Sequence, residues 1–267
     1  MKGMMHNVPF LHMSEPSLLY PLLAGMMVML MSLIGVIALN SFFQRWVHAH
    51  LSHLVSFAAG VFAVVVVNIF REAAATLALP ALAALASLGI GIMYALGKVI
   101  TDYHHHHRED ACENIPDHAR PHALRILAAD AVHNASDGIV IATAFIASVP
   151  LGIAVTLAVM VHEAIQELSE FFVLRRAGLS TKEALVQNFL VSSTVLIGIT
   201  AGLFLSEAKA LQGGVLTVAG GALLLVVAQD LIPHSLLVAR KEGVGRHMLW
   251  AALGAGAMAA IATTVAA

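Results

Sequence analysis

Long apolar stretches recur along the whole chain and are separated by mostly short polar segments. A helix that crosses a bilayer needs about twenty mostly apolar residues, and eight stretches meet this requirement. They lie at about residues 17–39, 52–71, 80–100, 122–148, 152–174, 185–205, 212–232 and 246–266. Backbone groups in lipid must bond internally, and the period-2 strands of a barrel are missing from the pattern. The sequence therefore predicts an all-α integral membrane protein with eight transmembrane helices.

Polar side chains set the fourth and fifth stretches apart from the others. Positions i, i+3, i+4 and i+7 of a helix share one face, and each of these two stretches fills such a series. The series are Asp130, His133, Asn134 and Asp137 on the first helix, and Glu163, Gln166, Glu167 and Glu170 on the second, with His162 beside them. Ionisable groups at membrane depth are costly and usually face a partner, a cavity or an ion path. We expect the two faces to pack together.

Side chains of these types would form a metal site if they converge. Imidazole nitrogens together with carboxylate and amide oxygens suit Zn²⁺ and other first-row divalent ions. A single His or Asn in a membrane helix commonly makes only a hydrogen bond between helices. Five carboxylates are different, because desolvating them without a counter-ion is costly. A cation would balance their charge, and Gly138 would allow a neighbouring helix to approach closely.

Composition agrees with a membrane protein and excludes other classes. The 267 residues are 59% hydrophobic and 11% charged, whereas soluble domains are about 25% charged. A net charge of −2 argues against nucleic-acid binding, and a single cysteine excludes an intramolecular disulfide. The first apolar run is too long for the core of a cleavable signal peptide, so we expect it to be retained as a span.

The distribution of basic residues predicts the orientation. Eleven of the fourteen Lys and Arg residues lie in or beside the loops that follow spans one, three, five and seven. Positive charge marks the cytoplasmic side, so these loops are predicted to be cytoplasmic and both termini extracytoplasmic. The chain is expected to form a single transmembrane domain, residues 1–267.

One longer loop, residues 101–121, is rich in histidine and is predicted to be cytoplasmic. Its candidate metal-catching residues are His104, His105, His106, His107, Cys112 and His118. Histidine-rich tracts often bind metal, but they are compositional signals. A solvated loop without a metal role explains this segment equally well.

The two polar segments resemble the signature of the ZIP (Zrt/Irt-like) family of divalent-metal transporters. Residues 130–138 match every fixed position of D-x-x-H-N-x-x-D-G, and residues 162–170 read H-E-A-I-Q-E-L-S-E where the family commonly has H-E-x-P-H-E-x-G-D. Further similarity covers residues 56–60, 188–190, 219–221 and 230–233.

The resemblance implies a transporter that moves divalent transition metals into the cytoplasm: Zn²⁺ first, and Fe²⁺, Mn²⁺ or Cd²⁺ in addition. It implies a 3+2+3 inverted-repeat arrangement of spans and no organic cofactor. A bacterial-type protein of the inner membrane, with a possible homodimer, is the corresponding expectation. The metal is the transported substrate.

The resemblance also implies a mononuclear or binuclear metal site between spans four and five. A first metal would take His133, Asp137, His162 and Gln166, and a second would take Asn134 and Glu163, with Asp137 and Gln166 able to bridge. Asp130, Glu167 and Glu170 are then supporting or pathway groups.

Departures from the family pattern bear on the site. Gln166 replaces a common histidine and offers a neutral oxygen, which would broaden selectivity beyond zinc; Ile165 replaces a proline that commonly kinks the helix. In span two, Asn68 and Glu72 only loosely match a family segment and are candidate entrance groups. Asp230 and His234 flank Pro233 and are candidate exit groups, although helix termination by Pro233 explains this pattern as well.

Two other functions share the same ligands. His162 and Glu163 begin like the HExxH motif of metalloproteases, in which two histidines bind zinc and the glutamate is the base. Gln166 stands at the second histidine of that motif, so an intramembrane zinc hydrolase needs a ligand from span four. The third possible function is that of a metal sensor without transport.

Overall fold

The computed structural model of the chain describes residues 18–39, 41–101, 119–206 and 209–266, and its regular structure over these ranges is helical throughout. The elements in chain order are α1 (Leu19–Met31), the 3-10 helix η1 (Ser32–Leu39), α2 (Ser41–Ala74), α3 (Leu79–Thr101), α4 (Ala119–Ala147), α5 (Val149–Arg176), α6 (Thr181–Ser192), α7 (Thr194–Leu205), α8 (Lys209–Val226), the π-helical turn η4 (Val227–Leu231), α9 (Ile232–Glu242) and α10 (Val244–Ala266). The all-α prediction is confirmed for these residues.

Seven helical segments of the described chain are long and apolar enough to cross a membrane. They are Leu19–Val36, Ala49–Ala74, Leu79–Leu96, Val149–Arg176, Thr181–Leu205, Leu211–Gln229 and Val244–Thr264. Each coincides with a predicted span, which supports an integral membrane protein. The predicted fourth span is helical, as α4, but is not among the seven. The polar residues of positions 130–138 lower its hydropathy.

Three predicted spans are interrupted or extended. The first passes from α1 into the 3-10 helix η1, and the sixth is divided between α6 and α7 at Ser193. The seventh does not end at Pro233. The π-helical turn η4 precedes this residue, and the chain continues as α9 with the proline in its first turn. Proline lacks an N–H and crowds the carbonyl four residues earlier, and the wider π turn accommodates both effects.

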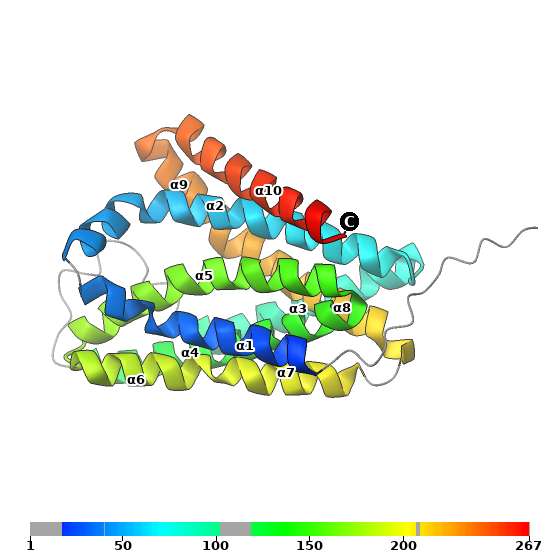
Figure 1. Ribbon diagram of the computed structural model, residues 1–267, viewed down its shortest axis with the longest axis horizontal. Helices are drawn as coiled ribbons and strands as arrows, with labels where there is room; N and C mark the ends of the chain where they lie inside the picture. The colour runs from blue at the N-terminus through cyan, green and yellow to red at the C-terminus, as the bar shows by residue number, and fades with distance from the viewer. Residues whose placement is uncertain (1–17, 40, 102–118, 207–208, 267) are drawn as a thin grey trace, which may run out of the picture.

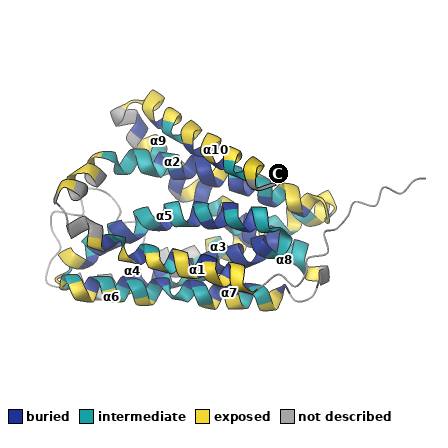
Figure 2. Ribbon diagram, in the orientation of Figure 1, coloured by how far each residue is buried: buried dark blue, intermediate teal, exposed yellow. Residues whose placement is uncertain are grey.

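Helix α5 runs through the middle of the bundle (Figure 1). It contacts α1 and α4 on one side and α2 and α10 on the other, while α2 packs along α10, α3 along α8 and α4 along α7. Burial follows this arrangement, because the outer faces of α1 and α10 are exposed whereas much of α5 is buried or half-buried (Figure 2). The polar segment of α5 therefore lies inside the bundle.

Glycines set the distance between α4 and α7. A Cβ atom on Gly138 would overlap the carbonyl oxygen of Val195, and one on Gly198 would overlap the carbonyl oxygen of Ala135. Each glycine thus faces the backbone of the other helix. The predicted close approach at Gly138 is confirmed. The approaching helix is α7, which packs against the face of α4 that carries Ala135 and Gly138.

Candidate metal centre

Helix α5 carries half of the candidate ligands and is well defined at both ends. The Ser148 hydroxyl caps its start by accepting a hydrogen bond from the Leu151 N–H at 3.3 Å, and a proline occupies its first turn. Arg175 and Arg176 lie in its last turn, where positive charge complements the helix dipole. The helix is continuous through Ile165, where the family proline is missing, so His162, Glu163 and Gln166 keep regular helical spacing.

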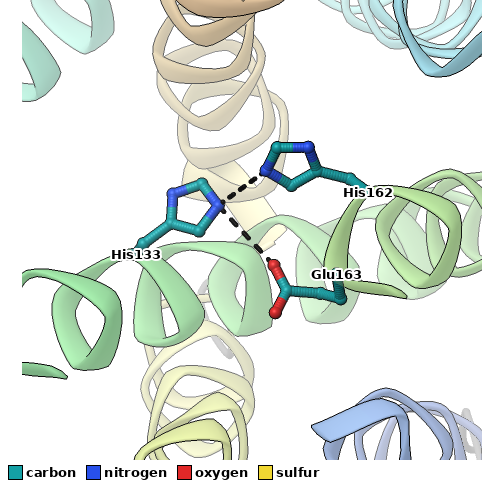
Figure 3. A group of neighbouring side chains, drawn as sticks. All are labelled: His133, His162 and Glu163. Atoms are coloured by element: carbon teal, nitrogen blue, oxygen red, sulfur yellow. Dashed lines mark hydrogen bonds and ion pairs between the residues drawn. The ribbon is translucent and has the colours of Figure 1, made fainter. Parts of the chain in front are cut away.

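Two imidazoles and one carboxylate meet between α4 and α5. His133 Nε2 lies 3.2 Å from His162 Nε2 and 3.6 Å from Glu163 Oε1 (Figure 3). One ligand atom from each of these residues lies within 4.8 Å of the other two. His133 and His162 are half-buried and Glu163 is fully buried. The predicted convergence of the two helices is therefore present at these three residues.

The spacing of these atoms matches metal coordination. Zn–N bonds of about 2.0–2.1 Å at a tetrahedral angle separate two ligand nitrogens by about 3.3 Å, close to the 3.2 Å between His133 and His162. The 3.6 Å to Glu163 needs only a small contraction to reach the same edge length. These two distances are therefore close to those around a single divalent ion, and the three ligand atoms lie within 4.8 Å of one another.

One neighbouring side chain lies close to each imidazole. Asp137 Oδ2 lies 3.8 Å from His133 Nε2, one turn further along α4, and its side chain is buried. Phe62 of α2 meets His162 edge to face, with ring centroids 5.5 Å apart. The phenyl ring thus forms an apolar wall that restricts the His162 ring, while Asp137 adds an oxygen beside the cluster.

Gln166 turns its amide nitrogen away from the imidazoles. Its Nε2 donates to Asp130 Oδ1 and, at 3.4 Å, to Glu170 Oε1. The residue also lies within reach of the His162 ring. Gln166 therefore sits between the imidazole cluster and a second group of acidic side chains.

Asn134 and Glu167 have partners on α6 that the sequence analysis did not identify. Asn134 Nδ2 donates to the Asp130 carbonyl at 3.2 Å, and its Oδ1 accepts a hydrogen bond from Ser192 at 3.4 Å. Asn188 Nδ2 donates to the Glu167 carbonyl at 3.1 Å. Ser192 and Asn188 are i, i+4 neighbours with fully buried side chains. Two polar residues at helical spacing within the sixth span were the signal that could have found them.

The carboxylates of α4 and α5 have few partners. Asp130, Asp137, Glu163, Glu167 and Glu170 are all buried, and each has at least one carboxylate oxygen without a hydrogen-bond partner among the described residues. Their ion pairs within the described part of the chain involve only His133. Unpaired buried carboxylates are costly, so a bound cation or a proton at these side chains would stabilise the region.

Other predicted site residues lie elsewhere or outside the described residues. Asn68 and Glu72 lie near the C-terminal end of α2. The side chain of Asn68 is half-buried and that of Glu72 is exposed. Asp230 lies in η4 and His234 in α9, but their side chains are outside the described part of the structure. The loop residues His104 to His107, Cys112 and His118 also lie outside the described residues. The roles predicted for all of them stay predictions.

Comparison with known families supports the resemblance noted from the motifs. Residues 98–262, more than half of the chain, match the family model described as ZIP Zinc transporter. The chain belongs to the ZIP zinc transporter family. Both halves of the candidate metal centre, on α4 and α5, fall inside the matched range.

Several similar proteins are animal zinc transporters of this family. The chain is 38% identical to Zinc transporter ZIP4 of Homo sapiens over 109 residues, which is 41% of this chain and 17% of that protein. It is 35% identical to Zinc transporter ZIP10 of Homo sapiens over 115 residues, or 43% of this chain and 14% of that protein. It is 30% identical to Zinc transporter foi of Drosophila melanogaster over 127 residues, which is 48% of this chain and 18% of that protein. The chain thus matches less than a fifth of each of these three relatives.

Proposed function

We propose that this ZIP family member carries divalent transition-metal ions across a membrane into the cytoplasm. Zn²⁺ is the first expected substrate, with Fe²⁺, Mn²⁺ and Cd²⁺ as further candidates. The observation that carries the proposal is the group of His133, His162 and Glu163, in which two imidazole nitrogens lie 3.2 Å apart and a carboxylate oxygen lies 3.6 Å from one of them. The names of the relatives, which are zinc transporters, support the same substrate class.

The transported ion binds between α4 and α5 in this proposal. His133, His162, Glu163 and Asp137 hold it, and Asn134 and Gln166 contribute their side-chain oxygens. Gln166 interacts with His162, and its amide nitrogen is engaged by Asp130 and Glu170, so its oxygen is the atom that would serve as a ligand. A second ion beside Asn134 and Glu163 would make the centre binuclear.

Helix α4 is proposed as the eighth span. Its 29 residues extend over about 43 Å, more than the roughly 30 Å hydrocarbon core of a bilayer. It packs along α5 and α7, two segments that are apolar enough to span. Its polar residues face these neighbours instead of lipid. With eight spans, the charge distribution leaves both termini extracytoplasmic, and the inner membrane of a bacterium is the proposed location.

The packing of the helices supports a 3+2+3 inverted repeat. Such a repeat exchanges spans one, two and three with spans six, seven and eight, and span four with span five. Under this exchange, the contact between α2 and α10 corresponds to the contact between α8 and α3. The contact between α4 and α7 corresponds in the same way to the contact between α5 and α1. All four contacts occur. Inverted repeats allow a central site to open alternately to each side.

The hydrolase alternative has less support. A zinc peptidase of the HExxH type binds its metal with a second histidine four residues after the first, whereas this chain has Gln166 at that position. Catalytic zinc also keeps an open coordination position. Four or more protein ligands around one ion would fill that position.

Reconstitution into vesicles that contain a metal-sensitive dye tests the proposal. The wild type should accumulate Zn²⁺, Cd²⁺, Fe²⁺ or Mn²⁺ inside the vesicles, and His133→Ala and Glu163→Ala should abolish most of this uptake. Glu183→Gln is the matched control. Glu183 is an exposed capping-box residue of α6, and glutamine preserves that motif. If the wild type moves none of the four ions, the transporter proposal is wrong, and hydrolysis of a membrane peptide that requires Glu163 would establish the alternative.

A further inference from the structure

An apolar crevice follows one side of α5, between α1 and α10. Both of these helices contact α5 but do not pack along each other, and Figure 1 shows α5 between them. The larger part of the crevice, about 360 Å³, is bounded by α1, α2, α5 and α10. A smaller part of about 150 Å³ lies between α1, α4 and α5. Leu157 and Met160 line both parts, so we treat them together as the α5 crevice.

The lining of the α5 crevice favours an apolar ligand over water. Apart from Tyr20 and Thr156 its side chains are all apolar, and the Thr156 hydroxyl already donates to the backbone of its own helix at 2.7 Å. Apolar cavities of about 150 Å³ stay dry and bind apolar ligands. Met31, Met160 and Met258 line the larger part, and flexible thioether side chains adapt to ligands of irregular shape.

The α5 crevice lies at membrane depth. The larger part takes its lining from four of the seven segments that are apolar enough to cross a membrane. On α5, Leu157, Met160, Val161 and Ala164 occupy positions i, i+3, i+4 and i+7, which share one face. All four are half-buried although α5 runs through the middle of the bundle. The gap between α1 and α10 therefore leaves this face open to the hydrocarbon of the bilayer.

We propose that the α5 crevice binds the acyl chain of a membrane phospholipid. Eleven residues separate Tyr20 from Met31 on α1, which is about 17 Å of helix. One leaflet supplies about 15 Å, half of the hydrocarbon core, so the crevice has the length of one acyl chain. Tyr20 is exposed near the start of α1, and tyrosine commonly lies at the level of the headgroups.

The bound lipid belongs to the outer leaflet in the proposed orientation, because α1 begins on the extracytoplasmic side. Val161 and Ala164 flank His162 and Glu163 in the chain. The acyl chain and the metal centre therefore contact the same turns of α5 from different sides. Lipid binding itself does not depend on the proposed transport function, so either proposal can fail without the other.

Photochemical labelling of the full-length chain in phosphatidylcholine vesicles tests the site. The probe is phosphatidylcholine with a diazirine group midway along one acyl chain, and mass spectrometry locates the label after illumination. We expect label on Met160 or Ala164 of α5. Leu88, an exposed residue of α3, should be labelled by the surrounding lipid in every variant and reports that the chain is folded and inserted.

Variants that fill the crevice give the decisive comparison. Ala257 is exposed and lines the opening on α10, so Ala257→Phe should reduce the label on α5 at least fivefold relative to the label on Leu88. Ile261→Trp, about one turn further along the same wall, should act alike. Ala252→Phe is the matched control, because Ala252 is exposed on α10 but does not line the crevice.

Three outcomes would overturn the proposal. The first is a wild type without label on α5, and the second is unchanged label on α5 in both filling variants. The third concerns a second copy of the chain as the occupant, which nanodiscs that hold a single chain exclude. If α5 is labelled in such nanodiscs but not in vesicles crowded with protein, a second copy occupies the crevice instead of lipid.

Discussion

His133 Nε2 and His162 Nε2 lie 3.2 Å apart although the two residues are 29 positions apart in the chain. Neither helix can supply both nitrogens, so the pair exists only where α4 and α5 cross. The distance is the edge length expected for two nitrogens on one tetrahedral Zn²⁺.

Zn²⁺ bound at the metal centre should have two imidazole ligands. X-ray absorption of the purified protein with one equivalent of Zn²⁺ is expected to show both, and His162→Ala should remove one of them. Affinity should fall at least tenfold, because even an outer-sphere partner of a metal ligand typically contributes about 10–100-fold. His50→Ala is the control, since that half-buried histidine of α2 bonds the Trp46 carbonyl, away from this centre. An unchanged spectrum in His162→Ala would remove this residue from the ligand set.

Metal uptake should decrease at acidic pH. Imidazole and carboxylate ligands must lose their protons to bind metal, so protons compete with the ion for its ligands. We expect initial uptake to fall severalfold between about pH 7.5 and about pH 5.5 when both sides of the vesicle have the same pH. Equal pH on the two sides separates ligand competition from proton coupling. Faster uptake at the lower pH would contradict ligand competition.

Gln166→His should shift selectivity toward zinc. An imidazole at this position would replace a neutral amide oxygen with a nitrogen ligand that Zn²⁺ favours over Mn²⁺. It would also break the hydrogen bonds to Asp130 and Glu170. Competition between Zn²⁺ and Mn²⁺ during uptake measures the change. If the Zn²⁺/Mn²⁺ preference stays the same, Gln166 is not a ligand of the transported ion.

Gly198→Ala should destabilise the contact between α4 and α7. The added Cβ would overlap the backbone of Ala135, and such overpacking typically costs about 1–3 kcal/mol. Gly256 on α10 is the matched control, because a Cβ there meets no atom within 4 Å among the described residues, and alanine is the better helix former by about 0.5–1 kcal/mol. Thermal unfolding in one detergent should show a lower midpoint for Gly198→Ala and an equal or higher one for Gly256→Ala. Equal midpoints for the two variants would contradict close packing at this position.

Local sequence pattern was sufficient for much of the fold. Hydropathy located the spans, because the length of apolar sequence that crosses a bilayer is fixed by its thickness. Helix α4 falls outside the seven segments that are apolar enough to span, since the polar residues of positions 130–138 reduce its hydropathy. The π turn before Pro233 was not predicted, because whether a helix breaks at proline or widens around it depends on the neighbours that support it.

The sequence by itself determined which faces of α4 and α5 are polar, and it identified the family through the spacing of His133, His162 and their neighbours. Helical periodicity is local, so one chain segment suffices to predict which side chains share a face. Only the tertiary structure decided which of them meet across helices. It paired the two imidazoles, directed Gln166 toward Asp130, and brought Asn188 of α6 to Glu167. Those contacts depend on how distant helices pack, and no pattern within one helix encodes that distance or rotation.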